Sequence, residues 1–166
     1  MKSNISDLSF ARSLYEAAFP LDERREFDDL INVAETKSAF RTEIFRQNTD
    51  LSGFIFYWKF SMFVYVEHFA VAEHLRNRGL GREIFQNFCD KTVLPIVLEV
   101  EKPDNEIAAR RIRFYEKFGF AVSEITYLQP AYSTHKYPVP MLLMQRGEVG
   151  IEKCVELLRK EVYEQD

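Results

Sequence analysis

A basic, glycine-containing segment that follows a predicted strand offers the clearest chemistry in the sequence. The strand ends in Phe69-Ala70-Val71, and the run Arg76-Asn77-Arg78-Gly79-Leu80-Gly81-Arg82 leads into a predicted helix. Amides in the first turn of a helix lack intrahelical acceptors and lie at the positive end of the helix dipole, so they bind anions. Gly79 and Gly81 allow the backbone to approach a diphosphate closely, and the arginines add positive charge. The segment predicts a phosphate-binding site; the alternative is that its glycines only form a turn.

Two common nucleotide-binding motifs do not fit this segment, and a third signature does. A dinucleotide site requires G-x-G-x-x-G and a P-loop requires Gly-Lys followed by Ser or Thr, whereas here Gly81 is followed by Arg82 and Glu83. The segment resembles the acetyl-coenzyme A (acetyl-CoA) signature of the GNAT superfamily of N-acetyltransferases, a strand ending in an apolar residue, Ala and Val, then Q/R-x-x-G-x-G/A at a helix start. Further along, Leu98-Glu99-Val100 and the run RFYEKFGF at 113–120 are similar to the second half of the family pattern.

The resemblance, which spans roughly 38–145, implies both a fold and a reaction. The fold is an α/β (α+β) arrangement of the GNAT acyl-CoA N-acyltransferase type, with a mixed, twisted sheet of about six to seven strands, flanking helices and an extra C-terminal helix. The reaction moves an acetyl group from acetyl-CoA to a primary amine by direct attack through a tetrahedral intermediate, without a metal. In such enzymes the pantetheine arm lies in a gap between two splayed strands, here 67–71 and 96–100. The residues assigned to the cofactor are Phe69, Ala70, Val71, Arg76, Asn77, Arg78, Gly79, Leu80, Gly81 and Arg82.

The implied reaction needs an acid and an oxyanion donor. The departing thiolate must be protonated, and the resemblance places Tyr115 near the thioester sulfur, where its phenol is protonated at neutral pH. A backbone amide near Phe69 is the expected donor to the oxyanion. Related members carry an Asn about two helical turns before the Tyr, where this chain has Ala108, and whether Asn105 replaces it stays open. The alternative for Tyr115 is an ordinary aromatic residue of the helix core.

The reaction also needs a base, because free amines have a pKa near 10 and attack only when neutral. Glu99 occupies the position used by a branch of the family that acts on protein N-termini, and Glu67 is the second candidate. His68 and Glu101 also lie at strand ends near the predicted gap. Strand alternation puts Glu67 on the face of Phe69 and His68 on the opposite face. The alternative is that Glu67 and His68 pair with each other or with a neighbouring Arg.

A loop over 127–138 is the expected wall of the acceptor site. It is rich in Tyr, Pro and His, and in the GNAT fold the final hairpin borders the acceptor groove. Tyr127, Tyr132 and His135 are therefore the candidate acceptor contacts, although the aromatic residues could equally pack among themselves. The loop holds neither an acidic nor a basic cluster, so it does not define the acceptor class.

Periodicity predicts the elements that position these residues. Apolar residues at three- and four-residue spacing predict helices over 6–19, 21–35, 80–90, 104–118 (capped by Asp104 and ended by Gly119) and from Ile151 onward. Period-two patterns predict strands over 39–45, 53–58, 62–71, 95–101, 120–125 and 139–145. The first three strands form an antiparallel meander, and the strand-helix-strand run that follows implies a parallel pair. The second helix is expected to point Asp22, Glu23, Arg24, Arg25, Asp28 and Asp29 outward.

Length and composition exclude several classes of protein. A chain of 166 residues predicts one domain over 1–166, with N-terminal helices over 6–36, a core sheet over 38–146 and a final helix over 151–164. A net charge of −4 argues against nucleic acid as a partner. No apolar leader or charge-free apolar stretch is present, so we expect a cytoplasmic, non-membrane protein with Cys89 and Cys154 reduced.

The expected partners are acetyl-CoA and an unidentified amine, with a homodimer left open because the last helix can serve as a lid or an interface. Two other hypotheses remain at this stage. One is a non-catalytic acyl-CoA-binding module, in which the basic loop still grips the cofactor but no base is positioned. The other is a partner-binding α/β domain whose glycines only make turns.

Overall fold

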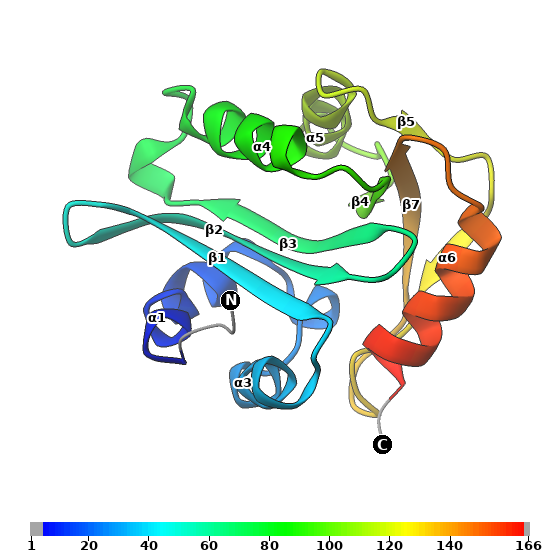
Figure 1. Ribbon diagram of the computed structural model, residues 1–166, viewed down its shortest axis with the longest axis horizontal. Coiled ribbons are helices and arrows are strands. Elements are labelled where there is room, and N and C mark those ends of the chain that lie inside the picture. The colour runs from blue at the N-terminus through cyan, green and yellow to red at the C-terminus, as the bar shows by residue number, and fades with distance from the viewer. Residues whose placement is uncertain (1–4, 165–166) are drawn as a thin grey trace.

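The computed structural model describes residues 5–164, which form a seven-stranded mixed sheet with helices on both faces (Figure 1). The strand order is β1-β2-β3-β4-β7-β5, and β6 also pairs with β7. Only β3 and β4 run parallel; the other pairs are antiparallel. The strands are β1 (Phe40–Gln47), β2 (Asp50–Lys59), β3 (Val64–Val71), β4 (Ile96–Glu101), β5 (Ala121–Val122), β6 (Tyr127–Gln129) and β7 (Val139–Arg146). The predicted fold class is confirmed.

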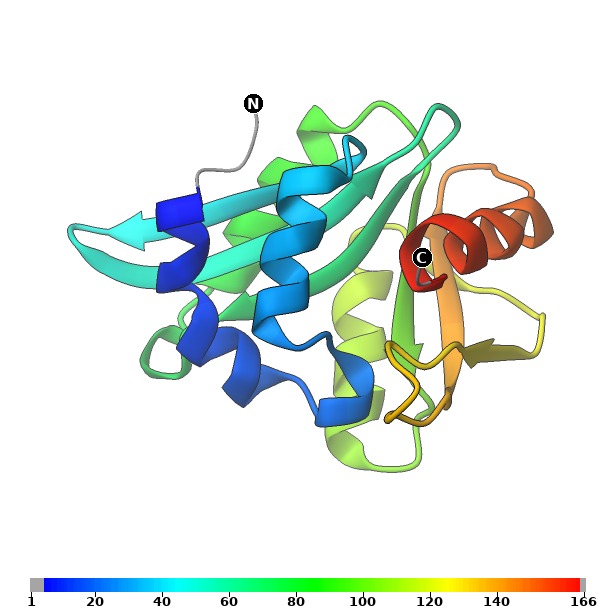
Figure 2. The ribbon, with the colours of Figure 1, turned by 90° about the horizontal axis from the view of Figure 1, so that it is seen from below.

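Two hydrophobic clusters, one on each face, attach the helices to the sheet. One face packs against α1, α2, α3 and α6, with Tyr15, Trp58 and Leu158 among the buried residues. The opposite face packs against α4 and α5, with Phe85 near the centre of its aromatic cluster. Figure 2 shows the N-terminal helices in front of β1 and β2 and the last helix beside β7. The helices are α1 (Ile5–Phe10), α2 (Arg12–Ala18), α3 (Phe27–Thr36), α4 (Leu80–Lys91), α5 (Glu106–Glu116) and α6 (Ile151–Leu158).

The meander and the parallel pair predicted for the middle of the chain are confirmed. The period-two runs form the antiparallel meander β1-β2-β3, and β4 returns parallel to β3 through α4. The Asp104 cap is wrong: Asn105 is the cap, its side-chain oxygen accepts from the Ala108 amide at 2.9 Å, and the helix spans Glu106–Glu116 within the predicted 104–118. Gly119, with φ +83°, follows the end of α5.

The two N-terminal helices predicted over 6–19 and 21–35 are each interrupted in the structure. The first helix is split at Ala11, whose amide bonds to the Leu8 carbonyl at 2.9 Å, as in a tight turn. Over 21–35 only a 3₁₀ turn, η1 (Leu21–Glu23), precedes α3. The expectation that Arg24 and Arg25 point outward is wrong, since they are 7% and 6% exposed. Both lie in the extended link between η1 and α3, and their guanidinium groups turn inward to buried oxygen acceptors.

The C-terminal third also differs from the prediction. The strand expected over 120–125 reduces to the two residues of β5, because the chain loops out at 123–126 before β6. Both short strands pair with β7, Val122 opposite Met144 and Tyr127 opposite Met141. The final helix is present, but after α6 it widens into a π-helical turn, η3 (Arg159–Tyr163).

Candidate active site

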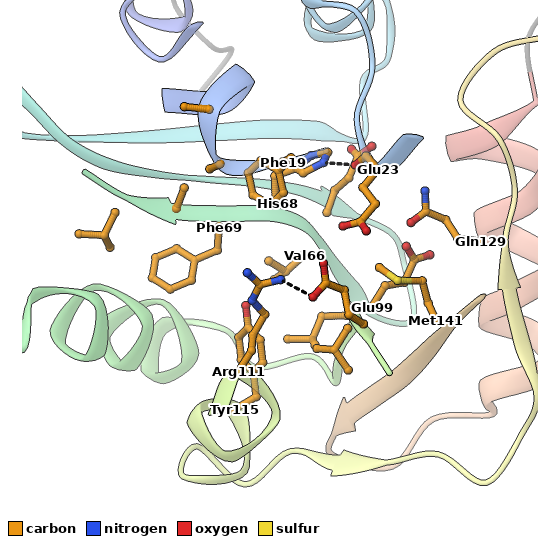
Figure 3. Close-up of a pocket in the computed structure, with 18 of the residues that line it drawn as sticks. Phe19, Glu23, Val66, His68, Phe69, Glu99, Arg111, Tyr115, Gln129 and Met141 are labelled. Carbon is orange, nitrogen blue, oxygen red and sulfur yellow. Dashed lines mark hydrogen bonds and ion pairs between the residues drawn. The ribbon is translucent and has the colours of Figure 1, made fainter. Parts of the chain in front are cut away.

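The parallel strands β3 and β4 pair briefly and then separate. Val64–Val66 pair with Ile96–Leu98, and no ladder pairs join 67–71 to 99–101. A cavity of about 350 Å³ lies between the separated ends, lined by both strands, α2, α5 and the segment around β6. Figure 3 shows Tyr115 and Arg111 reaching in from α5, across the cavity from Phe19 and His68. The gap that the resemblance implies is therefore present.

A β-bulge at Glu67 changes which way the side chains of β3 point. Phe56 of β2 pairs with His68 and Tyr57 pairs with Val66, so Glu67 is an extra residue between them. Phe69 packs on Phe85 of α4, with ring centroids 5.2 Å apart. His68 instead meets the aromatic rings of α2 on the other face, where Glu67 also finds its partners. The expectation that Glu67 shares a face with Phe69, and that His68 lies opposite Glu67, is therefore wrong.

The Glu67 carboxylate is fully enclosed by partners. Arg25 Nη1 makes an ion pair with it, the Trp58 indole N–H donates to Oε2 at 2.7 Å, and the Tyr132 hydroxyl donates to Oε1 at 2.9 Å. The side chain has 0% exposure. Burial by itself raises the pKa of Glu67, but the positive charge of Arg25, the neighbouring His68 and the hydrogen bonds from Trp58 and Tyr132 together outweigh burial and leave the pKa below its usual value. Glu67 thus takes the alternative of pairing with an Arg, while His68 Nε2 contacts the Glu23 carbonyl oxygen at 2.9 Å.

The Glu99 carboxyl has hydroxyl partners instead of a cation. Tyr127 donates to Oε1 at 2.5 Å, and the Tyr163 hydroxyl lies 2.9 Å from Oε1 and 2.8 Å from Oε2. Burial raises the pKa of Glu99 to about 7, because it outweighs the hydrogen bonds that favour the charged form; the charge of Glu67 also raises it. Glu99 lines the cavity and is half-buried, so an acidic group that changes charge near neutral pH faces the gap.

Tyr115 lines the same cavity from α5. Its ring packs against Phe85 at 5.2 Å and Phe120 at 5.9 Å, and burial raises the pKa of its hydroxyl to about 12. The hydroxyl is therefore protonated at neutral pH and can donate a proton. Core packing and a place at the cavity are both observed for this residue.

Two more carboxyl groups, those of Glu23 and Glu101, lie at the wall formed by η1 and the end of β4. Arg111 Nη1 lies 3.6 Å from Glu101 Oε2. Burial, together with the neighbouring Glu101, raises the pKa of Glu23 to about 7. Both carboxyl groups belong to residues that line the cavity.

The basic loop has a conformation that suits a phosphate group. Asn77 and Gly79 have φ of +61° and +83°, and no side chain caps the start of α4. A Cβ on Gly81 would lie 3.3 Å from Val71 Cγ2, so glycine lets α4 begin close against the end of β3. The open first-turn amides of a twelve-residue helix beside exposed arginines fit the diphosphate of a CoA molecule.

The predicted site residues divide into two groups. Phe69, Ala70, Val71 and Arg76 line the cavity, as do Glu67, Glu99, Tyr115 and Tyr132. The other six cofactor candidates lie on the loop and first turn of α4, outside the cavity lining. Tyr127 contacts Glu99, whereas His135 is exposed and does not line the cavity. Asn105 caps α5.

Sequence reasoning missed Arg25, Trp58 and Tyr163, which hold the two candidate carboxyl groups. Trp58 lies on a strand and Arg25 in a run of charged residues, and neither pattern distinguishes it from its neighbours. Within 5–164 no cluster of three or more His, Cys, Asp or Glu could hold a metal ion. Over the same residues, no helix has the length and apolar character to cross a membrane.

Comparison with known proteins identifies the family. Residues 8–120 match the model of the acetyltransferase (GNAT) family, while a search of curated proteins found no match. A protein assigned to the GNAT family of acetyltransferases, from Bacteroides thetaiotaomicron, has a TM-score of 0.89 and 37% identity, covering 100% of this chain and 98% of that chain. The ribosomal-protein-S18-alanine N-acetyltransferase from Escherichia coli has a TM-score of 0.65 at 19% identity, covering 90% and 94%, and shows the fold alone. This chain belongs to the GNAT acetyltransferase family.

Proposed function

We propose that this protein is an acetyl-CoA-dependent N-acetyltransferase that acts on a primary amine, with Glu99 as the general base. The observation that carries the proposal is the Glu99 carboxyl, which faces the gap between β3 and β4 and has a pKa raised to about 7 by burial. A base of this strength is charged for part of the time at neutral pH and can take a proton from an ammonium group. Membership in a family that uses acetyl-CoA supports the choice of donor.

In this proposal acetyl-CoA lies with its diphosphate at the start of α4 and its thioester inside the gap. The diphosphate would bind the first-turn amides of α4, with Arg76, Arg78 and Arg82 nearby, and the pantetheine arm would enter along 69–71. The thioester would then lie between Tyr115 and Glu99, both of which line the cavity. Tyr132, from the loop after β6, would border the acceptor.

The reaction then follows from the groups around the gap. Glu99 takes a proton from the ammonium group, and the neutral nitrogen attacks the carbonyl carbon of the thioester. A backbone amide near Phe69 would stabilise the oxyanion of the tetrahedral intermediate. As the C–S bond breaks, Tyr115 donates its proton to the departing thiolate. The nitrogen of the intermediate also loses its second proton to solvent, Glu99 releases its proton to solvent, and Tyr115 regains a proton from solvent, so each turnover yields an amide, CoA and, in total, one proton.

Glu67 is not assigned the role of base. Its carboxylate already accepts hydrogen bonds from Trp58 and Tyr132 and pairs with Arg25, and its side chain is fully buried. A low pKa and complete enclosure both oppose the uptake of a proton from a substrate.

The first test measures binding and turnover together. Thermal unfolding is followed with about 1 mM acetyl-CoA, with NADH and ATP as phosphate-bearing controls; at 100 times the dissociation constant the ligand stabilises the protein by about 2.7 kcal/mol. This corresponds to a rise of roughly 5–10 °C in melting temperature for a chain of this size. Release of CoA is then measured with a panel of primary amines. No specific shift together with no amine-dependent CoA release would refute the proposal.

The Glu99→Gln variant separates an enzyme from a binding module. It should keep the thermal shift but lose turnover by about 10²–10⁴-fold, the usual contribution of a general base. Glu124→Gln, at an exposed position outside the cavity, is the matched control and should match the unsubstituted protein. Equal turnover of the Glu99 variant and the control would contradict the role of Glu99.

A further inference from the structure

The last turn of the chain reaches the carboxyl group of Glu99. The Tyr163 hydroxyl lies 2.9 Å from Glu99 Oε1 and 2.8 Å from Oε2, and it is 3.0 Å from the Tyr65 hydroxyl. Tyr163 is 64 residues from Glu99 in the sequence and lies beyond 8–120, the part of the chain that the family model matches. The contact is therefore a feature of this chain that the shared motifs do not describe.

The turn that carries Tyr163 is held in place by buried groups. After α6 the helix widens into the π-helical turn η3, closed by a hydrogen bond of 2.8 Å from the Glu164 amide to the Arg159 carbonyl. Arg25 Nη2 donates to the carbonyl of Val162, the residue just before Tyr163. The same guanidinium pairs with Glu67 and lies 4.6 Å from the centre of the Tyr132 ring. The Tyr163 ring thus has a fixed direction.

Tyr163 can act on Glu99 only as a hydrogen-bond donor at neutral pH. Burial and the neighbouring Glu99 raise the pKa of its hydroxyl well above the ordinary value, so the hydroxyl keeps its proton. A donor that faces both carboxyl oxygens favours the charged form and restrains rotation of the group. Burial acts in the opposite direction on Glu99, so the charge of this carboxyl depends on its donors.

We propose that Tyr163 is a positioning residue whose hydroxyl aims the Glu99 carboxyl group into the gap and favours its charged form. This inference rests on the proposed function, in which Glu99 is the base. Its effect adds to those of the other titratable groups that face Glu99. These are Tyr65 and Glu67 of β3, Tyr127 of β6 and Tyr132 of the loop before β7.

The test compares Tyr163→Phe with the unsubstituted protein. Phe keeps the ring and removes only the hydroxyl, and a hydrogen bond to a charged group is worth about one to two pKa units. The midpoint of the acid limb of kcat/KM should therefore move up by about one pH unit or more. At pH values below the midpoint kcat/KM should fall by about tenfold, and at pH values above it by less than about twofold. Tyr137→Phe is the control, because Tyr137 is 74% exposed and does not line the cavity. A limb that does not move in Tyr163→Phe would overturn the inference.

A second measurement does not depend on turnover. With ¹³C-labelled glutamate carboxyl groups, the Glu99 signal is assigned by its loss in Glu99→Gln and is titrated in both proteins. Its midpoint should rise by about one unit or more in Tyr163→Phe and stay unchanged in Tyr137→Phe. Coincident midpoints would refute the role of Tyr163 even in an active enzyme. A shifted midpoint in a protein that acetylates no amine would support the role of Tyr163 while the proposed function fails.

Discussion

Replacing Glu67 with Gln should destabilise the fold strongly, because the carboxylate neutralises a buried cation. Gln has nearly the same size but no charge, so Arg25 stays charged and buried without its counter-ion. The Glu67 side chain is fully buried and Arg25 is nearly so, which puts the pair in the class whose disruption costs about 3–5 kcal/mol. At about 2–4 °C per kcal/mol for a chain of this size, the melting temperature should fall by roughly 6–20 °C.

The assay is thermal unfolding followed by circular dichroism at pH 7. Glu16→Gln is the matched control, because Glu16 pairs with Arg12 at 3.0 Å on an exposed helix surface. Such a surface pair contributes about 0.3–0.5 kcal/mol, so the control should melt within about 2 °C of the unsubstituted protein. If Glu67→Gln melts as high as this control, the pair does not stabilise the fold and the argument is wrong.

The same variant predicts a pH dependence of known sign. The pKa of Glu67 is lowered in the folded state, so its contribution is fully present above its unfolded value of about 4.3. This contribution of Glu67 to stability is lost as the pH falls through its lower pKa in the folded state. The difference in melting temperature between the unsubstituted protein and Glu67→Gln should therefore be constant from pH 6 to 7 and shrink in strong acid. A difference that grows on acidification would contradict this assignment.

Three further predictions concern other parts of the molecule. The kcat/KM of the unsubstituted enzyme should rise through pH about 7 and level off above it, because Glu99 must lose its proton to act as a base; a flat profile from pH 5 to 9 would exclude this. Gly53→Ala should lower the melting temperature by roughly 2–12 °C in a calorimetric scan, since its Cβ would lie 2.6 Å from the Ala70 carbonyl oxygen and force β2 from β3. Burial raises the pKa of Cys89 and Cys154 to about 11, so neither thiol should react with a thiol reagent at pH 8 until the protein is unfolded.

The strand, loop and helix of the candidate cofactor site could be predicted from sequence because their signals are local. Strand, basic loop and helix follow one another without interruption from β3 into α4, and the glycines of the loop lie where the turn and the close packing require them. The meander before this segment is equally local, since each hairpin joins strands that are neighbours in the chain.

The contacts of the two candidate bases, Glu67 and Glu99, could not be predicted in the same way, because they join distant segments. Arg25 lies 42 residues from Glu67, and Tyr163 lies 64 residues from Glu99. Periodicity reports only that Arg25 is polar, and within a charged run that pattern favours an exposed helix face. The bulge at Glu67 has no signal in the alternation of β3, yet one extra residue turns His68 to the face opposite the expected one.

The two carboxyl groups begin from equivalent positions and differ in their surroundings. Val66 and Leu98 form the last pair of the parallel ladder, and Glu67 and Glu99 are the residues that follow them. Burial opposes charge on both, but Glu67 pairs with the guanidinium of Arg25, whereas Glu99 has hydroxyl partners and no cation and also feels the charge of Glu67. At Glu67 a full positive charge, together with hydrogen bonds and the neighbouring His68, overcomes the effect of burial, whereas at Glu99 hydroxyl dipoles offset burial only in part. A base must hold and release a proton near neutral pH, so the carboxyl group without a cation suits the reaction and its neighbour suits the fold.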